Sequence, residues 1–444
     1  MEDGAVHHVE PPTSPAVPVA DGEVDFGGEV DSDSEVDSDS EVDFDSEVDF
    51  DSEVDFDSEV DFDAVELADL RRRTSSKWRA YPPDVLPAWL AELDVPLAAP
   101  IRRALHAAVE LGDTGYACPD DVPAAFAEYT ARSGWMVDPD QVWVIPDVMT
   151  GIAEILQVAT APGDPVVVNP PIYPPFFSVV TDLGRTVVEV PLIRAAATGW
   201  DLDLAGLAAA FQAGARAYLL CSPHNPVGRV WAAEQLRQVA ELAAAHDVLV
   251  LADEIHAPLT LPGVTHTPFT SLGGPATEHG VVLTSASKAW NTAGLRCAVA
   301  VSAGPGGRAV LDRLPAYGRH KAGILGATAA VAAFRDGGAW LAALVAHLDR
   351  NRWLAADLFA EHLPGVGYLP PEAGYLAWLD CTALGFGDNP AYVFLKRGRV
   401  ALSPGPHFGR EGTGFARLNL GTSRDLLTEA VHRMAATTAV PTAG

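Results

Sequence analysis

The segment Thr284-Ser-Ala-Ser-Lys288-Ala-Trp-Asn-Thr-Ala-Gly-Leu-Arg296 directly follows the apolar run Val281-Val-Leu283. Such a run predicts a buried strand, so the lysine amine lies at the mouth of that strand. A primary amine in a partly apolar site is neutral often enough to form an imine with a carbonyl group. The hydroxyls of Ser285 and Ser287 and the guanidinium of Arg296 suit a phosphate dianion.

One cofactor needs both an imine-forming amine and a phosphate site, namely pyridoxal 5′-phosphate (PLP). For Lys288 taken alone, a surface lysine that follows a strand is the simpler interpretation. The rest of the chain has to decide between the two.

The first 63 residues contain 24 Asp and Glu and no Lys or Arg, in a chain of 444 residues with a net charge of −31. Residues 23–64 run as hexads: EVDFGG, EVDSDS twice, EVDFDS three times and EVDFDA. Because like charges repel and apolar content is low, we expect residues 1–65 to be a disordered tail. Within a hexad, alternation places Val and Phe on one face and the acids on the other. Solubility, weak cation binding or a docking arm are the functions open to this tail.

The remaining 381 residues carry a net charge of −7 and can bury a large core. The acidic tail argues against nucleic acid as a direct partner, because polyanions repel each other. The first 30 residues have neither a basic start nor an apolar core, so we expect no signal peptide. The longest strongly apolar stretch, residues 322–334, is too short to span a bilayer. Four widely spaced cysteines favour reduced thiols in a cytoplasm.

Short β-rich runs alternate with helical stretches between about residues 100 and 320. Near-continuous Val and Leu in these runs indicates a mostly parallel sheet covered by helices on both faces. Strands are expected at residues 142–145, 165–168, 186–192, 217–222, 248–253, 281–285 and 297–302, with helices at 151–159 and 232–245. Ligands of such sheets bind beyond the carboxyl ends of the strands.

Residues 326–444, together with residues 66–100, are predicted to form a smaller α/β domain. It follows a large domain of residues 101–325. Its expected elements are a helix at residues 340–363, strands at 375–380 and 417–420, and a last helix. The Gly- and Pro-rich residues 402–414 are expected to fold back over a cleft.

Polar residues follow several of the expected strands. Asp253 could keep a pyridine nitrogen protonated, which makes the ring an electron sink, or it could cap the next turn. His256 could touch the same ring or fill a polar pocket. The amide of Asn225, in a proline-flanked turn, could donate to a phenolate oxygen, although a bare Asn-Pro turn is common.

Two further segments lie at strand ends. Tyr173, in a proline-stiffened loop, could stack on a cofactor ring or simply pack against its neighbours. The segment Ile145-Pro-Asp-Val148-Met149 leads into a helix, and the N–H groups at a helix start bind phosphate. An ordinary strand–helix junction is the alternative. Each of these motifs alone is weak evidence for a PLP site, but the order in which they follow one another along the chain is specific.

In this order the residues resemble the PLP-dependent class I/II aminotransferase superfamily of fold type I. Within it, the chain is most similar to the MalY/PatB group of cystathionine β-lyases. The resembling stretches are Lys77-Trp78, Leu86-Pro-Ala-Trp-Leu-Ala-Glu-Leu-Asp94, Gly115-Tyr116, Pro171-Ile-Tyr173, Ser222-Pro-His-Asn-Pro-Val-Gly228, Asp253-Glu-Ile-His256, Ser285-Ala-Ser-Lys288 and Arg417-Leu-Asn419. The resemblance covers residues 77 to about 425 and implies a large domain with a seven-stranded sheet beside a smaller α/β domain.

The resemblance also implies a role for each matching residue. Lys288 would be the Schiff-base lysine and proton shuttle, and Arg417 would grip the α-carboxylate of an amino-acid substrate. Tyr116 would reach the phosphate of the neighbouring subunit, which implies a homodimer with shared sites. The other residues would hold the cofactor: Asp253 the pyridinium nitrogen, Asn225 and His256 the 3′-oxygen, Tyr173 the ring face, and Ser285, Ser287, Arg296, Val148 and Met149 the phosphate.

The chain departs from the family pattern at several positions. Leu90-Ala-Glu-Leu-Asp-Val95 stands where the group usually reads Val-Ala-Asp-Met-Asp-Phe, and Thr292 and Cys297 differ from the usual lysine motif. Asp147 brings an acid into the phosphate loop, which is unfavourable unless it points away. These differences leave the substrate preference open.

The activity implied is that of a PLP-dependent carbon–sulfur β-lyase, which cleaves cystathionine or a related cysteine S-conjugate to a thiol, pyruvate and ammonia. An aminotransferase is the first alternative, but His256 stands where many aminotransferases of the superfamily have Tyr. A serine hydrolase using Ser285 and Lys288 would need Ser-Asp-Asn and Lys-Thr-Gly partners that the chain lacks. A binding protein that acts through its hexads is the third alternative, and the retained PLP-contacting residue types argue against it.

Overall fold

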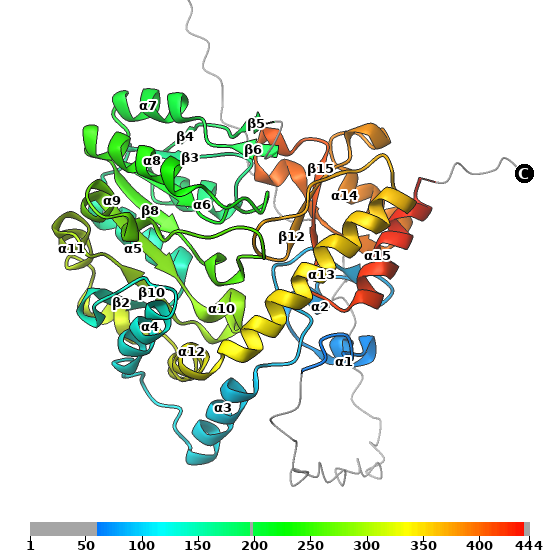
Figure 1. The fold of residues 1–444 in the computed structure, drawn as a ribbon, viewed down its shortest axis with the longest axis horizontal. Coiled ribbons are helices and arrows are strands. Elements are labelled where there is room, and N and C mark those ends of the chain that lie inside the picture. Colours follow the sequence, from blue (N-terminus) through cyan, green and yellow to red (C-terminus); the bar gives the residue numbers. More distant parts are fainter. Residues whose placement is uncertain (1–59, 196–198, 439–444) are drawn as a thin grey trace, which may run out of the picture. The chain divides into compact units, whose positions relative to one another are not determined.

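Seven short strands rich in Val, Leu and Ala form the central sheet of the computed structural model, which describes residues 60–195 and 199–438 (Figure 1). Strand β10 runs antiparallel to both of its neighbours, and all other neighbouring pairs are parallel. The order across the sheet is β2 (Val142–Ile145), β10 (Ala298–Val301), β9 (Gly280–Thr284), β8 (Leu249–Asp253), β7 (Ala217–Cys221), β3 (Pro165–Val168) and β4 (Thr186–Glu189). The expected seven-stranded, mostly parallel sheet is confirmed: β2 and β3 have the expected bounds, and the ends of the other five strands differ by at most three residues.

Helices cover both faces of this sheet, which explains why its strands are apolar throughout. Along β9, Val281 and Leu283 belong to the hydrophobic cluster on one face and Val282 to the cluster on the other. The first face packs against α5 (Val148–Ala159), α6 (Pro175–Asp182) and α11 (Pro305–Leu311). The second packs against α4 (Asp121–Ala131), α7 (Leu204–Gln212), α8 (Ala233–Ala245) and α12 (Ile324–Asp336).

A second, antiparallel sheet is built from the C-terminal part of the chain. It has the order β11 (Gly367–Tyr368), β12 (Leu376–Asp380), β15 (Phe415–Asn419) and β14 (Ser403–Pro404). The helices α13 (Gly338–His362) and α15 (Arg424–Ala436) pack on it around a hydrophobic cluster of their own (Figure 1). The N-terminal strand β1 (Leu86–Pro87) pairs with β13 (Val400–Ala401), so residues from both ends of the folded part meet here. The division into domains at residues 101 and 326 stays a prediction, because the described residues form one compact unit.

Among the described residues, no single helix has both the length and the apolar character to cross a membrane. Helices α12 and α13 satisfy both criteria only as a pair, and they are bent by 82° at their junction.

Residues 60–65, which we expected to belong to the disordered tail, pack against the folded part. Phe62 is 3% exposed and lies in the core, while Val60 packs beside it and Asp61 is exposed. Val60 and Phe62 thus share the packed side, as predicted for a hexad, but residues 62 and 63 form a turn and not a strand. Residues 1–59 lie outside the described part of the chain, so the disorder expected there stays a prediction.

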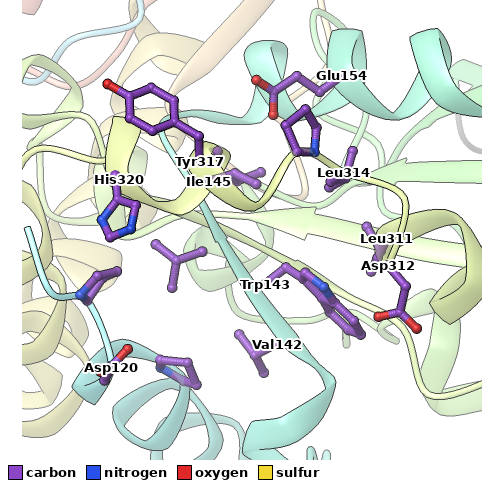
Figure 2. A pocket seen from close by; sticks show the side chains of 15 residues that line it. Asp120, Val142, Trp143, Ile145, Glu154, Leu311, Asp312, Leu314, Tyr317 and His320 are labelled. Carbon is purple, nitrogen blue, oxygen red and sulfur yellow. The ribbon is translucent and has the colours of Figure 1, made fainter.

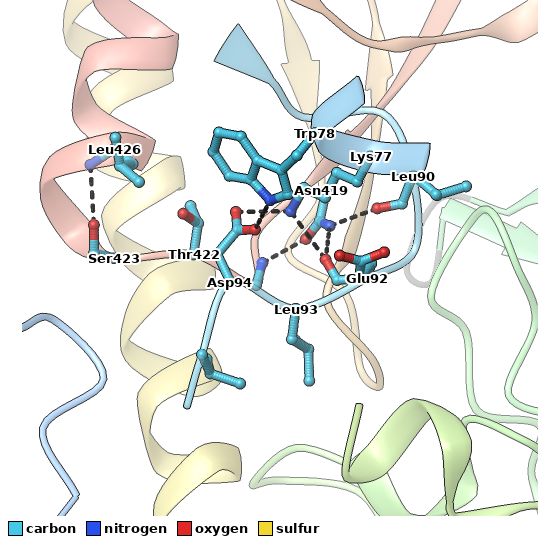
Figure 3. Close-up of polar contacts among 12 residues, drawn as sticks. Lys77, Trp78, Leu90, Glu92, Leu93, Asp94, Asn419, Thr422, Ser423 and Leu426 are labelled. Atoms are coloured by element: carbon cyan, nitrogen blue, oxygen red, sulfur yellow. Dashed lines mark hydrogen bonds and ion pairs between the residues drawn. The ribbon is translucent and has the colours of Figure 1, made fainter. Parts of the chain in front are cut away.

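Residues 89–95, here called the strap, are fixed by side chains from distant parts of the sequence (Figure 3). Lys77, 1% exposed, donates from Nζ to Asp94 Oδ2 at 2.7 Å and to the carbonyl of Glu92 at 2.9 Å. Asn419 Nδ2 donates to the carbonyls of Leu90 and Glu92, both at 2.7 Å. A buried carboxylate is tolerated only when it is paired and hydrogen-bonded, and Trp78 Nε1 adds a further bond to Asp94 at 3.0 Å.

Replacing Lys77 by methionine should lower the free energy of unfolding by about 3–5 kcal/mol, because Asp94 would stay buried without its cation. Urea denaturation of the purified protein measures this loss. The matched control is Arg72→Met, which removes a cation whose ion pair with Asp69 is exposed and should change stability by less than about 0.5 kcal/mol. A loss for Lys77→Met no larger than that of the control would contradict the role given to this ion pair.

Candidate active site

A cavity of about 180 Å³ lies beyond the carboxyl ends of the central strands. It brings together eleven of the twelve residues that the sequence singled out, from seven separate segments of the chain. They are Val148, Met149, Tyr173, Asn225, Asp253, His256, Ser285, Ser287, Lys288, Arg296 and Arg417. The twelfth, Tyr116, is 92% exposed and does not line this cavity.

The sheet explains why these side chains meet. Strands β7, β8 and β9 are parallel, so their carboxyl ends, and with them Asn225, Asp253 and Lys288, lie at one edge. Strand β10 is antiparallel, and its beginning therefore lies at the same edge. Arg296 precedes β10 and so reaches the same cavity as residues that follow the other strands.

Lys288 lies on the short helix α10 (Ala286–Ala289), which the side chain of Ser285 caps. Its Nζ donates to the carbonyl of Ala91 in the strap at 2.8 Å. Burial and, to a smaller extent, the nearby Arg417 together lower the pKa of Lys288 to about 8, and Asp253 opposes the shift. The amine is therefore neutral far more often at neutral pH than an exposed lysine.

Asp253 ends β8, and its Oδ1 accepts a hydrogen bond from the N–H of Ile255 at 3.1 Å. Burial raises the pKa of this carboxyl to about 7, against the opposing effects of that hydrogen bond and of Lys288. A positive charge placed beside Asp253 would restore its ionised form. Burial lowers the pKa of His256 to about 3, so its imidazole is neutral, and its Nδ1 has no partner among the described residues.

Arg417 lies on β15 and is 5% exposed. Its guanidinium donates to Asn225 Oδ1 at 2.9 Å and to Ser403 Oγ and the carbonyl of Trp89, both at 3.1 Å. Burial lowers its pKa to about 10, which leaves it charged at neutral pH. All three acceptors are neutral, and Nε has no partner in the described part of the chain. A buried cation held in this way is an anion site for a carboxylate.

At the start of α5, an acid lies beside one of the expected phosphate ligands. Asp147 does not point away from the phosphate loop: its Oδ2 lies 2.6 Å from Arg296, and its Oδ1 caps the helix by accepting from the N–H of Thr150 at 2.9 Å. Ser285 Oγ donates to the carbonyl of Cys297 at 2.6 Å, so its proton is already engaged. An anion bound here would share Arg296 with Asp147.

Four contributors to the cavity region were not predicted from the sequence. The carbonyl of Ala91 accepts from Lys288 and also from the hydroxyl of Tyr375, the latter at 3.1 Å. Ser403 supports Arg417, and Cys221 lines the cavity with a thiol whose pKa burial raises. Tyr375 and Ser403 stand in segments that the sequence marked as a strand and a loop over a cleft. A main-chain carbonyl leaves no signal in the sequence.

The loop expected over a cleft, residues 402–414, does reach the site. The ring of Phe408 lies 4.9 Å from the guanidinium carbon of Arg417, and its carbonyl accepts from the N–H of Ile172 at 2.8 Å. Phe408 itself is buried. The loop therefore packs against Arg417.

The cavity matches the chemistry of PLP group by group. It offers an amine for the aldehyde, a buried carboxylate for the ring nitrogen, an aromatic side chain for the ring face and an amide for the ring oxygen, from Lys288, Asp253, Tyr173 and Asn225. The N–H groups that begin α5 and the guanidinium of Arg296 suit the phosphate. The orphaned Nδ1 of His256 is a further buried polar atom that a bound group can satisfy.

Comparison with known proteins agrees with this arrangement. The chain is 45% identical to a putative cystathionine beta-lyase of Mycobacterium leprae over 391 residues, which cover 83% of this chain and 96% of that one. It is 35% identical to cystathionine beta-lyase PatB of Bacillus subtilis, covering 80% and 92% of the two chains. Among solved structures, a putative PLP-dependent beta-cystathionase of Corynebacterium diphtheriae superposes with a TM-score of 0.80 at 36% identity, over 86% of this chain and 99% of that one. The family model for aminotransferase class I and II matches residues 111–434, and the chain belongs to this family.

Proposed function

We propose that the chain is a PLP-dependent carbon–sulfur β-lyase that cleaves cystathionine or a related cysteine S-conjugate to a thiol, pyruvate and ammonia. The observation that carries the proposal is the shared cavity of Lys288, Asp253 and Arg417, an amine, a carboxylate and an anion site within one pocket. The similarity to proteins named cystathionine beta-lyase supports the same activity.

When bound, PLP supplies an electrophilic carbonyl and an aromatic ring that accepts electrons from the α-carbon of an amino acid. Arg417 would bind the α-carboxylate through two nitrogens, in place of its neutral partners Trp89 and Ser403. Lys288, with its lowered pKa, would take the α-proton at Nζ. Asp253 would hold the proton of the ring nitrogen in place.

Two observations favour a lyase over an aminotransferase. The first is His256, which faces the cavity as a neutral imidazole where many aminotransferases of the superfamily carry a tyrosine. The second is that the relatives of highest identity reported above are named lyases, whereas a protein named aspartate aminotransferase is 26% identical over 66% of this chain.

We also propose that the enzyme is cytoplasmic, for which the support is its four widely spaced cysteines, and that it is a homodimer, for which the support is the position of Tyr116. Residues that follow this exposed tyrosine in the chain line a cavity of about 800 Å³. The cavity is formed by edge strand β2, η5 (Ala316–Lys321) and the end of α11 (Figure 2). His320 Nδ1 contacts the carbonyl of Ala117 at 3.4 Å, so the loop that carries Tyr116 lies along this hollow. Tyr317, which lines this cavity, is 67% exposed, and a second copy of the chain would cover it.

The purified protein should release pyruvate from cystathionine without any keto-acid acceptor. Lys288→Ala should abolish this activity and the visible absorbance band of the cofactor, while Ser271→Ala, an exposed position outside the cavity, should leave both unchanged. Pyruvate is measured by coupling to lactate dehydrogenase. Strict dependence on a keto-acid acceptor would contradict the lyase proposal and support an aminotransferase.

Stability of the cofactor-free protein should depend on pH through Asp253. Its pKa is raised from 3.8 to about 7, so the folded state binds an extra proton between these values and loses stability as pH rises through them. Asp253→Asn removes this penalty, which is at most about 4 kcal/mol at pH 8 and absent near pH 4. Urea denaturation at both pH values measures the difference.

The control for this pH series is Asp138→Asn. Asp138 is exposed and accepts from the N–H two residues ahead, as Asp253 does, but without burial. Its substitution should give the same small change at both pH values. A gain for Asp253→Asn that does not grow with pH would contradict burial as the cause of the raised pKa.

A dimer with shared sites predicts complementation between two inactive variants. Mixing Lys288→Ala with Tyr116→Ala under conditions of subunit exchange should restore up to about a quarter of wild-type turnover, because one site of each mixed dimer is intact. Sedimentation equilibrium tests the dimer separately. A monomer at micromolar concentration, or mixtures no more active than their components, would overturn this proposal.

A further inference from the structure

The last hexad of the acidic tail packs against Trp340 and His347 of α13 and Arg424 of α15, three residues here together called the groove. The ring of Phe62 meets Trp340 edge to face at 5.5 Å and lies 5.3 Å from His347, both on α13. Phe62 is 3% exposed and His347 fully buried. The phenylalanine therefore anchors the chain by burying a whole aromatic ring.

The next residue is held as specifically. Asp63 Oδ1 accepts from the main-chain N–H of Arg424 at 2.8 Å, and its Oδ2 accepts from Arg424 Nε at 2.7 Å. Arg424 is the first residue of α15, whose initial N–H groups have no partner within the helix and attract a negative charge. The pKa of Asp63 is lowered: burial opposes the shift, but the two hydrogen bonds from Arg424 outweigh it. The groove therefore recognises a phenylalanine followed by an aspartate.

The same two-residue unit recurs upstream at regular spacing. Phe44-Asp45, Phe50-Asp51 and Phe56-Asp57 stand in the same place in hexads that match the last one almost residue for residue. Two other hexads, residues 29–34 and 35–40, have Ser in place of Phe and could not fill the groove. The chain therefore holds three further potential ligands for a site that takes one.

We propose that the groove formed by Trp340, His347 and Arg424 is a binding site for the Phe-Asp units of the hexads. Phe44-Asp45, Phe50-Asp51 and Phe56-Asp57 can each replace Phe62-Asp63 in the groove of their own chain. The tail can thus be anchored through any one of four Phe-Asp units. Exchange between units shifts the tail along the folded part by whole hexads.

Two physical effects make exchange between the Phe-Asp units feasible. Moving from Phe62 to Phe56 lengthens the segment that precedes α1 (Leu67–Arg72) by one hexad, and loop closure costs only about 0.6 kcal/mol for each doubling of length. A tethered unit also competes at an effective concentration on the order of millimolar. Exchange would therefore be limited mainly by release of the docked unit, since all four units have the same two side chains to offer.

The test uses full-length protein and the substitution that two hexads already carry, Phe→Ser. Phe62→Ser should lower the midpoint of thermal unfolding by less than half as much as replacing Phe44, Phe50, Phe56 and Phe62 together. Replacing the first three alone should leave the midpoint at the wild-type value. Equal losses for the single and the fourfold variant would overturn the proposal, because Phe62 would then be a unique anchor.

A direct measurement uses a fluorescein-labelled peptide of residues 47–52, with the peptide of residues 29–34 as the matched control. By fluorescence anisotropy, the first should bind the fourfold variant at least about tenfold more tightly than it binds the wild type, whose own units compete. Arg424→Ala in the fourfold variant should weaken this binding. Equal binding of both peptides would overturn the proposal.

Failure of the fourfold variant to fold is informative as well. If Phe62→Ser folds and the fourfold variant does not, the upstream units compensate and the proposal holds. If Phe62→Ser alone fails to fold, no upstream unit takes its place and the proposal is wrong.

Discussion

The register of β8 between β7 and β9 is the constraint on which the active site depends. Asp253 pairs with Cys221 on one side and with Leu283 on the other, and the N–H of Glu254 continues the ladder to the carbonyl of Leu283 at 2.8 Å. A shift by one residue would turn Asp253 to the opposite face of the sheet and place an apolar side chain in the cavity. The two-sided apolar packing of the three strands prevents such a shift, so the core and the site are set by the same contacts.

Much of this arrangement could be predicted from the sequence. Apolar runs bounded by polar residues mark buried strands, and parallel strands bring their carboxyl ends to one edge. Asp253, Asn225 and Lys288 each follow such a run, and so their convergence followed from the pattern. Arg296 was assigned to the phosphate from its place eight residues after Lys288. Nothing in the sequence shows, however, that β10 runs antiparallel and so begins at the same edge.

Other features could not be predicted, for reasons that differ. The bond from Lys288 to the carbonyl of Ala91 joins residues 197 positions apart through a group that every residue possesses. The ion pair of Asp147 with Arg296 depends on rotamers that spacing does not reveal. Phe62 was assigned to the tail because its hexad reads like its neighbours, although it fits a groove whose two halves come from α13 and α15.

The strap links the two charged groups on which turnover would depend. The carbonyl of Trp89 accepts from Arg417, and that of Ala91, two residues on, accepts from Lys288. An anion that takes over Arg417 therefore removes one support of the strap, and loss of the proton from Lys288 weakens the other. Linkage is reciprocal. If the strap is released more easily, Arg417 binds the anion more tightly and Lys288 loses its proton at a smaller cost in free energy. The affinity for an amino acid and the rigidity of the seven-residue strap are in this way coupled through one equilibrium.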